Sequence, residues 1–209
     1  MTAGAAFPDA YRGRPFHDGV RATGVQRVPG RLMCAFYDTG GEGVAYHDAA
    51  DRNQGSGGLN PLDGGYLNGF RADEAVGVSY TKGDGIDDHP YNDHLPEPGL
   101  LYVGWTSPGN WLRYTVEVTG PGPFAATLLY TAAHDGAVAL TVDDAPVEEV
   151  VEVPCTAGGD DVEWRRYHHW ALLPPFRVPA LTPGRHVLTL HTVRTGQMNY
   201  AWLDFHPTG

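Results

Sequence analysis

Acidic, amide and imidazole side chains are concentrated in one short stretch of the chain. Seven of the eleven positions from 84 to 94 carry them: Asp84, Asp87, Asp88, His89, Asn92, Asp93 and His94. Carboxylate oxygens are calcium ligands, and neighbouring imidazoles are zinc ligands. The spacing matches neither an EF-hand loop nor a helical His-x-x-x-His pair. A metal-binding loop and a solvated acidic loop both remain open, and Tyr91 within this stretch is a candidate stacking surface for a sugar.

Carboxylates that could serve acid–base chemistry also occur in stretches with loop composition. They are Glu42, Asp48, Asp51, Asp73, Glu74 and Glu163. Glycoside hydrolysis uses two carboxyl groups roughly 5 to 10 Å apart across a cleft, but no spacing in this sequence marks one pair as acid and base. No Gly-x-Ser-x-Gly elbow is present. A small enzyme therefore stays an alternative whose catalytic groups the residues do not identify.

The charge balance argues against several kinds of partner. The chain of 209 residues has 25 Asp and Glu against 14 Lys and Arg, a formal net charge of −11. Such a surface repels phosphate backbones and anionic membranes, so we expect neither nucleic acid nor a membrane as partner. No apolar run approaches the roughly 20 residues that span a bilayer. Residues 1–8 show no signal-peptide pattern.

The cysteine content points to neither a disulfide framework nor a metal site. Cys34 and Cys155 are the two cysteines, and no Cys-x-x-Cys motif is present. Either the two pair with each other or they are two buried thiols.

Short runs with the pattern of β-strands supply the scaffold that must position these side chains. Most have about five to eight residues, are rich in Val, Leu, Thr, Tyr and Trp, and end at Gly, Pro or Asp. The runs are 32–37, 76–81, 101–106, 111–118, 124–131, 137–142, 147–153, 170–178, 185–193 and 200–205. No window of a dozen residues has helical periodicity. The sequence therefore predicts an all-β sandwich or barrel of about ten short strands.

Two long loops and an N-terminal segment interrupt this rhythm. Residues 1–28 lack periodicity and are predicted to be an arm or linker, which leaves residues 29–209 for the sandwich. Residues 38–70 and 82–99 are rich in Gly, Asn and Asp. Long loops in compact domains are often functional, because a rigid scaffold positions them.

Five phrases, in order along the chain, resemble the family 6 carbohydrate-binding modules and their relatives. One of them is Val103-Gly104-Trp105-Thr106, which is followed by a strand that begins with Gly109-Asn110-Trp111-Leu112. The others fall in residues 30–38, 40–48, 181–190 and 199–205. The resemblance covers roughly residues 29 to 207, with residues 82–99 as an apparent insertion. It implies a galactose-binding-like jelly-roll fold.

The sequence departs from the family at a structural metal site. Modules of this kind commonly hold a calcium ion with carboxylates from the first and last strands. The matching positions here are Met33, Ala35 and Ala201, whose side chains have no oxygen. Because calcium takes six to eight oxygen ligands, the resemblance predicts that this site is lost and that the module needs no cofactor.

The resemblance also places a sugar cleft at the loop edge of the sandwich. Such clefts put a flat aromatic ring under the sugar and polar groups around the rim. Carried over to this chain, the site consists of Trp105, Trp164 and Asn199, with Tyr46 or His47 from the first loop. Tyr167 is the alternative to Trp164, because the spacing departs from that of the family there.

Each aromatic residue also has a structural interpretation. Trp105 lies at the end of a run and is either a sugar contact or a core residue. Trp111, Trp170 and Trp202 lie within or at the start of runs and are predicted to be in the core. One of His168 and His169 is expected to be exposed, because neighbours in a strand face opposite sides.

Three functions from different classes follow. The first is a non-catalytic module that binds an oligo- or polysaccharide, more readily a neutral one, and holds a parent glycan-active enzyme on it. The second is a small glycoside hydrolase or lyase that uses loop carboxylates, His or Tyr. The third is a structural domain with a vestigial cleft. By analogy with the family, the protein would be extracellular.

Overall fold

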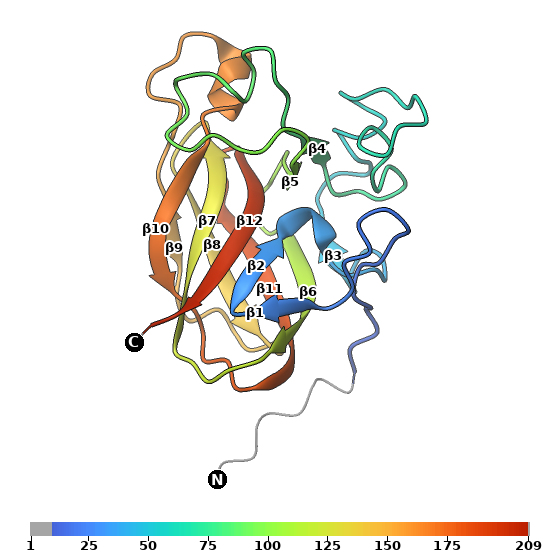
Figure 1. Ribbon diagram of the computed structural model, residues 1–209, viewed down its shortest axis with the longest axis vertical. Coiled ribbons are helices and arrows are strands. Elements are labelled where there is room, and N and C mark those ends of the chain that lie inside the picture. The colour runs from blue at the N-terminus through green and yellow to red at the C-terminus, as the bar shows by residue number, and fades with distance from the viewer. Residues whose placement is uncertain (1–9, 209) are drawn as a thin grey trace.

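Two six-stranded β-sheets pack face to face in the computed structural model, which describes residues 10–208 (Figure 1). The first sheet has the order β1-β6-β11-β8-β9, and β3 also pairs with β6. Its strands are β1 (Gln26–Val28), β3 (Tyr46–His47), β6 (Trp111–Val118), β8 (Gly136–Val142), β9 (Val151–Val153) and β11 (Gly184–Arg194). The β1–β6 pair is parallel, and the other pairs of this sheet are antiparallel.

The second sheet is antiparallel and has the order β10-β7-β12-β5-β4, with β2 paired to β12. Its strands are β2 (Gly30–Met33), β4 (Val78–Tyr80), β5 (Leu101–Val103), β7 (Phe124–Ala132), β10 (Ala171–Arg177) and β12 (Met198–Pro207). Two short 3₁₀ helices, η1 (Cys34–Phe36) and η2 (Glu163–Tyr167), complete the elements. The predicted all-β sandwich is confirmed.

Alternation along β6 shows how the sequence builds the core. Leu112, Tyr114, Val116 and Val118 are buried between the sheets, whereas Arg113 and Glu117 are partly exposed on the outer face. Apolar residues of both sheets form one cluster with these side chains. Burial of such apolar surface stabilises the fold by roughly 25 cal/mol per Å².

Two segments that were predicted as strands differ in the structure. Cys34–Phe36 forms η1, because the side chain of Gln26 accepts a hydrogen bond from Met33 N (2.7 Å) and donates to Phe36 O (3.3 Å), which replaces a neighbouring strand. The run 147–153 forms a strand only at Val151–Val153, because β8 pairs only there and residues 147–150 are solvent-exposed. Trp111 is only half-buried, whereas Trp170 and Trp202 are buried as expected.

The N-terminal segment packs on the sandwich over its described part. Residues 1–9 of the predicted arm lie outside the described residues. Arg14 forms an isolated antiparallel β-bridge with Thr39. Phe16 is buried and its ring stacks on that of Phe36, with 5.2 Å between ring centroids. Further along, β1 pairs with β6. Residues 10–28 therefore contribute to the same core as the strands that follow.

The long loops gather at one end of the sandwich, the upper end in Figure 1. The 82–99 insertion and η2 lie together there, and residues 50–75 lie beside them.

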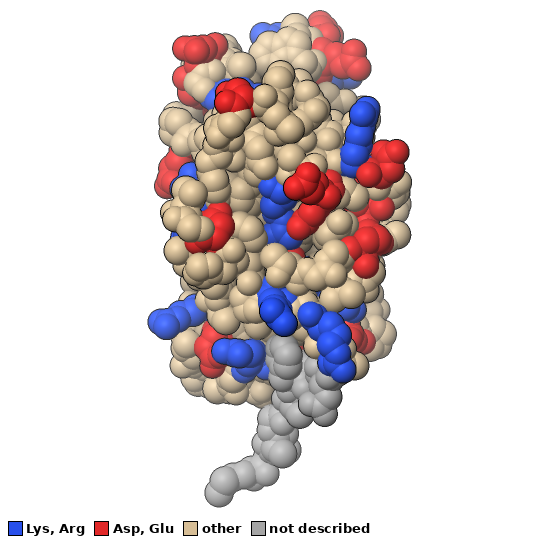
Figure 2. All heavy atoms as spheres, turned by 90° about the vertical axis from the view of Figure 1, so that its right-hand side faces the viewer, with Lys and Arg blue, Asp and Glu red and all other residues tan. Residues whose placement is uncertain are grey.

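Figure 2 shows a mainly uncharged face on which acidic and basic side chains form small separate groups. Both cysteines are free thiols; Cys34 is buried, as one alternative expected, whereas Cys155 is exposed, which that alternative did not expect. Over residues 10–208, no helix is long and apolar enough to cross a membrane.

Candidate functional site

A cavity with aromatic walls opens at this loop end of the sandwich, and its volume is about 650 Å³. Ligand sites in proteins commonly enclose roughly 300 to 1,000 Å³. We call it the aromatic cavity. Residues from four separate parts of the chain line it: Leu59, Tyr102, Trp105, Thr106, Glu163, Trp164, Tyr167, His168, Gln197 and Asn199.

Trp105 has an unusual backbone conformation, since its φ of 52° lies in the left-handed region. A bulky residue there is strained by the clash of its Cβ with the backbone, which costs of order 1 to 3 kcal/mol. The side chain is 40% exposed although its neighbours in β5 are buried. The conformation turns the indole out of the strand and into the cavity.

Two glycines let the Trp105 ring lie against the backbone. A Cβ at Gly77 would be 2.8 Å from Trp105 Cε3, and one at Gly55 would be 2.9 Å from Cζ3. Both distances are shorter than side-chain atoms tolerate, so only glycine fits at these positions. The indole therefore has glycine backbone on one side and the cavity on the other.

Hydrogen bonds fix the chain on both sides of Trp105. Gly104 N donates to Gly77 O (2.9 Å). The hydroxyl of Thr106 donates to Met198 O (3.0 Å) and accepts from Met198 N (3.2 Å). The strained residue is thus held between two anchored neighbours, which gives a ring fixed in place before any ligand arrives.

The opposite wall of the cavity comes from η2 and the residue after it. Trp164 is 49% exposed and meets the edge of His168 at 5.8 Å between ring centroids. The carbonyl of Tyr167 accepts hydrogen bonds from Thr131 Oγ1 (3.0 Å) and Asn199 Nδ2 (2.8 Å). These bonds join the end of η2 to β7 and β12. The exposed ring of Trp164 therefore faces the cavity from a rigid support, as that of Trp105 does.

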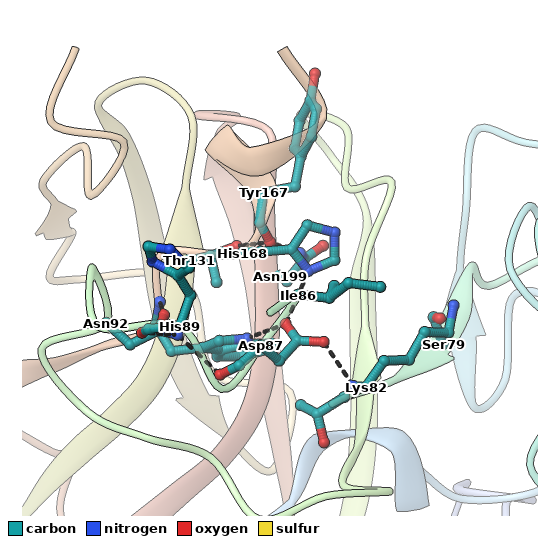
Figure 3. Close-up of polar contacts among 12 residues, drawn as sticks. Ser79, Lys82, Ile86, Asp87, His89, Asn92, Thr131, Tyr167, His168 and Asn199 are labelled. Carbon is teal, nitrogen blue, oxygen red and sulfur yellow. Dashed lines mark hydrogen bonds and ion pairs between the residues drawn. The ribbon is translucent and has the colours of Figure 1, made fainter. Parts of the chain in front are cut away.

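The 82–99 insertion braces this wall from behind (Figure 3). Trp170 N donates to Asn92 Oδ1 (2.5 Å), and His94 N donates to Trp170 O (3.0 Å). The ring of Tyr91 stacks on that of His169 at 4.1 Å. The acidic stretch is therefore docked on residues 168–170, although its composition is that of a solvated loop.

Electrostatics in the aromatic cavity are modest. Glu163 is the single carboxylate among its lining residues, and no Lys or Arg lines it. Tyr102 is buried in the floor, and desolvation raises the pKa of its hydroxyl well above the usual value, so the phenol is neutral. Between residues 10 and 208, no group of three or more His, Cys, Asp or Glu side chains is arranged to hold a metal ion.

Solved structures show which fold this is. A family 6 carbohydrate-binding module of Clostridium stercorarium, in complex with cellobiose, aligns with a TM-score of 0.53 and 10% sequence identity, over 88% of this chain and 98% of that chain. The chain has the fold of a family 6 carbohydrate-binding module. A β-1,3-glucan-binding family 6 module of Bacillus halodurans gives a TM-score of 0.50 and 16% identity, over 87% and 98% of the two chains.

A third family 6 module, studied for its binding sub-sites, gives a TM-score of 0.52 at 8% identity over 88% of this chain and 98% of that chain. No family model matches the sequence, and no curated protein matches it. The fold is therefore shared with these modules at a sequence identity of 8 to 16%.

The positions that match the family's calcium ligands lie in apolar surroundings. Ala35 and Ala201 are fully buried, and Met33 is partly buried at the end of β2. Met33 and Ala201 belong to one cluster with Trp170 and Trp202. No side-chain oxygen is available at the three positions, so this donor set does not fit calcium.

Three of the residues that the sequence analysis nominated line the aromatic cavity together: Trp105, Trp164 and Asn199. Tyr167, the alternative to Trp164, also lines it, so the structure brings both residues to the cavity. Asn199 is only 6% exposed, and its side-chain amide nitrogen donates a hydrogen bond to Tyr167 O. Its role is therefore at least partly to support the η2 wall.

Tyr46 and His47 lie outside the aromatic cavity. The ring of Tyr46 is buried against Tyr37 (5.5 Å between centroids), which removes it from the candidate site. His47 is exposed, and its Nδ1 lies 2.5 Å from Glu42 Oε1.

Tyr91 is likewise not among the lining residues of the aromatic cavity. Its hydroxyl donates to Ile86 O (2.6 Å), and its ring stacks between those of His89 and His169. It joins the insertion to the η2 wall rather than offering a free face.

Sequence reasoning did not nominate several lining residues. Leu59 and Gln197 lie in two separate loops with no distinguishing motif. Tyr102 lies in a strand that predicts only core positions. His168 was one of two adjacent histidines of which one was expected to be exposed. His168 is partly exposed and His169 is buried. Both residues lie between η2 and β10, outside any strand, so the alternation of a strand is not the reason.

Proposed function

We propose that this protein binds an oligosaccharide by stacking a pyranose ring on Trp105, with Trp164 across the aromatic cavity. The observation that carries the proposal is the conformation of Trp105, which keeps an indole exposed at the cost of a strained backbone. Strain of this kind persists where function requires it. Aromatic faces match the C–H face of a pyranose, and polar groups on a rim match its hydroxyls.

A neutral sugar suits the cavity better than an acidic one. The lining has one carboxylate, Glu163, and no Lys or Arg to pair with a uronate. The chain as a whole has a formal charge of −11, which adds long-range repulsion. Cellobiose and β-1,3-glucan, which are named for two modules of similar fold, are sensible first probes.

The test is a glycan screen followed by titration of the wild type beside three tryptophan variants. Trp105→Ala and Trp164→Ala should each weaken binding at least about tenfold, since tenfold corresponds to about 1.4 kcal/mol. Trp111→Ala is the matched control, because Trp111 is half-buried on the outer face of the first sheet and does not line the cavity. Equal losses in all three variants, or no binding to any glycan, would refute the proposal.

The same wells should be assayed for released products. Hydrolysis ordinarily needs a pair of carboxyl groups, and Glu163 is the only one in the lining, so we expect binding without turnover. Product formation that is lost with Glu163→Gln would instead favour the small-enzyme alternative.

We further propose that the module serves to hold a glycan-active enzyme on its polysaccharide. A neutral stacking cleft with no catalytic pair contributes proximity rather than chemistry. The proposal is tested by fusing the chain to a glycoside hydrolase that lacks a binding module. The fusion should gain rate on the insoluble polysaccharide and not on soluble oligosaccharides, and the Trp105→Ala fusion should lose that gain.

A further inference from the structure

The carboxylate of Asp87 lies directly behind the η2 wall of the aromatic cavity. The residue is buried, with 1% of its surface exposed. Its Oδ1 accepts from Trp170 Nε1 (2.6 Å) and lies 2.8 Å from His168 Nδ1. Its Oδ2 accepts from Lys82 N (2.7 Å). In Figure 3, His168 lies on one side of this carboxylate and Lys82 on the other.

The partners of Asp87 determine which nitrogen of His168 carries the proton. The indole N–H of Trp170 and the backbone N–H of Lys82 can only donate, so both require acceptor oxygens. A carboxylate has no proton to give, and therefore the contact with His168 is a bond donated by Nδ1–H. In the neutral ring this leaves Nε2 without a proton, as an acceptor.

This acceptor belongs to a side chain that lines the aromatic cavity. The His168 side chain is 16% exposed and stands beside Trp164. Among the described residues, none makes a hydrogen bond to Nε2, and the hydrogen bond of the ring is that of Nδ1 with Asp87. A half-buried acceptor without a partner in the protein is suited to a donor from a ligand, and a sugar hydroxyl is such a donor.

We propose that His168 is a specificity-determining residue of the cavity, whose Nε2 accepts a hydrogen bond from one hydroxyl of a neutral pyranose. Asp87 is its positioning residue, because it fixes both the tautomer and the orientation of the ring. The insertion thereby takes part in recognition. This inference rests on the proposed function, since it names the polar contact that accompanies stacking on Trp105.

Selectivity between sugars follows from this contact. A pyranose whose hydroxyl at the contacted carbon is removed leaves Nε2 unpaired in a partly desolvated site. Sites that pair a substrate hydroxyl discriminate against analogues that lack it. We therefore expect one monodeoxy analogue, and not the whole series, to bind about tenfold more weakly than its parent.

The experiment is NMR of the histidine ring nitrogens and tryptophan indole N–H groups in the full chain, at about pH 8, where free imidazole is neutral. The free protein should show His168 with a protonated Nδ1 and an unprotonated Nε2. The ring is assigned by the signal that disappears in His168→Phe, which keeps a flat ring beside Trp164. His206→Phe, the same change near the end of β12, is the control.

The probes are the methyl pyranosides of glucose, galactose, mannose and xylose, with their monodeoxy analogues. We expect at least one pyranoside to shift both the Trp105 indole signal and His168 Nε2, and one deoxy analogue to lose about tenfold in affinity. In His168→Phe that parent and that deoxy analogue should bind equally, whereas His206→Phe should behave as wild type.

Three results would overturn the inference, and they are distinguishable from one another. A proton on Nε2 in the free protein would remove the acceptor. A pyranoside that shifts the Trp105 indole without moving His168 Nε2 would leave the proposed function standing and exclude His168. No effect of any pyranoside on Trp105 would refute the proposed function, and the role of His168 with it.

Discussion

The indole of Trp105 lies against the backbone of Gly77 so closely that a methyl group on Gly77 would come within 2.8 Å of Trp105 Cε3. The glycine is thus part of the site although it does not line the aromatic cavity. Its other close neighbours are Gly104 O at 3.0 Å, which is backbone, and Trp105 Cβ at 3.2 Å, which is bonded to backbone, so both yield less easily than the ring. The ring is what an added methyl group displaces.

Gly77→Ala should therefore tilt the indole and weaken sugar binding by about tenfold, close to the loss in Trp105→Ala. Binding is measured by titration and ring displacement by tryptophan fluorescence. Gly120→Ala is the control, because a Cβ there meets nothing within 4 Å. Unchanged affinity in Gly77→Ala would show that the ring position is not set by this packing.

The left-handed backbone of Trp105 gives a prediction about stability that is independent of any ligand. Trp105→Gly should be more stable than Trp105→Ala by about 1 kcal/mol, since glycine enters this region without the Cβ clash. The comparison is made by urea unfolding. The same pair of substitutions at Trp164, which lies in η2 and has no positive φ, should give the opposite order because alanine is the better helix former. Equal stabilities at position 105 would argue against strain.

Acid stability should report the turn that Asp18 organises. Desolvation opposes ionisation of this carboxyl, but hydrogen bonds from Tyr66 and from the backbone of Arg21, Ala22 and Val20 outweigh it and lower the pKa from 3.8 to about 2. Because the folded pKa lies below the unfolded one, the contribution to stability is complete above pH 3.8 and is lost as the pH falls through about 2.

The measurement is the pH titration of the Asp18 carboxyl carbon by NMR, with a midpoint expected at about 2. Unfolding free energies of wild type and Asp18→Asn should converge at the acid end of that window and separate above it. A midpoint near 3.8, the unperturbed value, would mean that the turn does not hold the carboxylate in solution.

Thiol chemistry should separate the two cysteines. Cys155 is exposed, whereas Cys34 is completely buried, and desolvation raises the pKa of its thiol far above the ordinary value. Since the thiolate is the reactive form, one thiol should react in the native protein and two in denaturant. Cys155→Ser should abolish the native reaction. Fewer than two thiols in denaturant would indicate a disulfide instead.

The sequence predicts the scaffold better than the site, for physical reasons. Alternation along residues 111–118 is enforced by burial of one face, so β6 was predicted with its bounds. Cys34–Phe36 was not predicted as η1, because the substitute partner is the side chain of Gln26, which no local pattern announces. A backbone hydrogen bond to a side chain elsewhere in the chain depends on the tertiary structure, so the local sequence does not predict it.

Within the site, the two tryptophans were predicted and the means of holding them were not. The residues on either side of Trp105 are held by partners distant in the sequence: Gly104 by Gly77, and Thr106 by Met198. Asp87 stands in an acidic run with Asp84 and Asp88, which are exposed as a solvated loop would be. Its own burial could be recognised only once Trp170 was known to lie beside it.

The shared carboxylate of Asp87 has a consequence for how the protein responds to warming. Its partners belong to the insertion and to the segment after η2, and loss of this one group would free both together. Segments tied in this way open as a cooperative unit, and such units can open well below the temperature at which the sheets separate. Sugar recognition would then fail on heating while the β-structure is still intact.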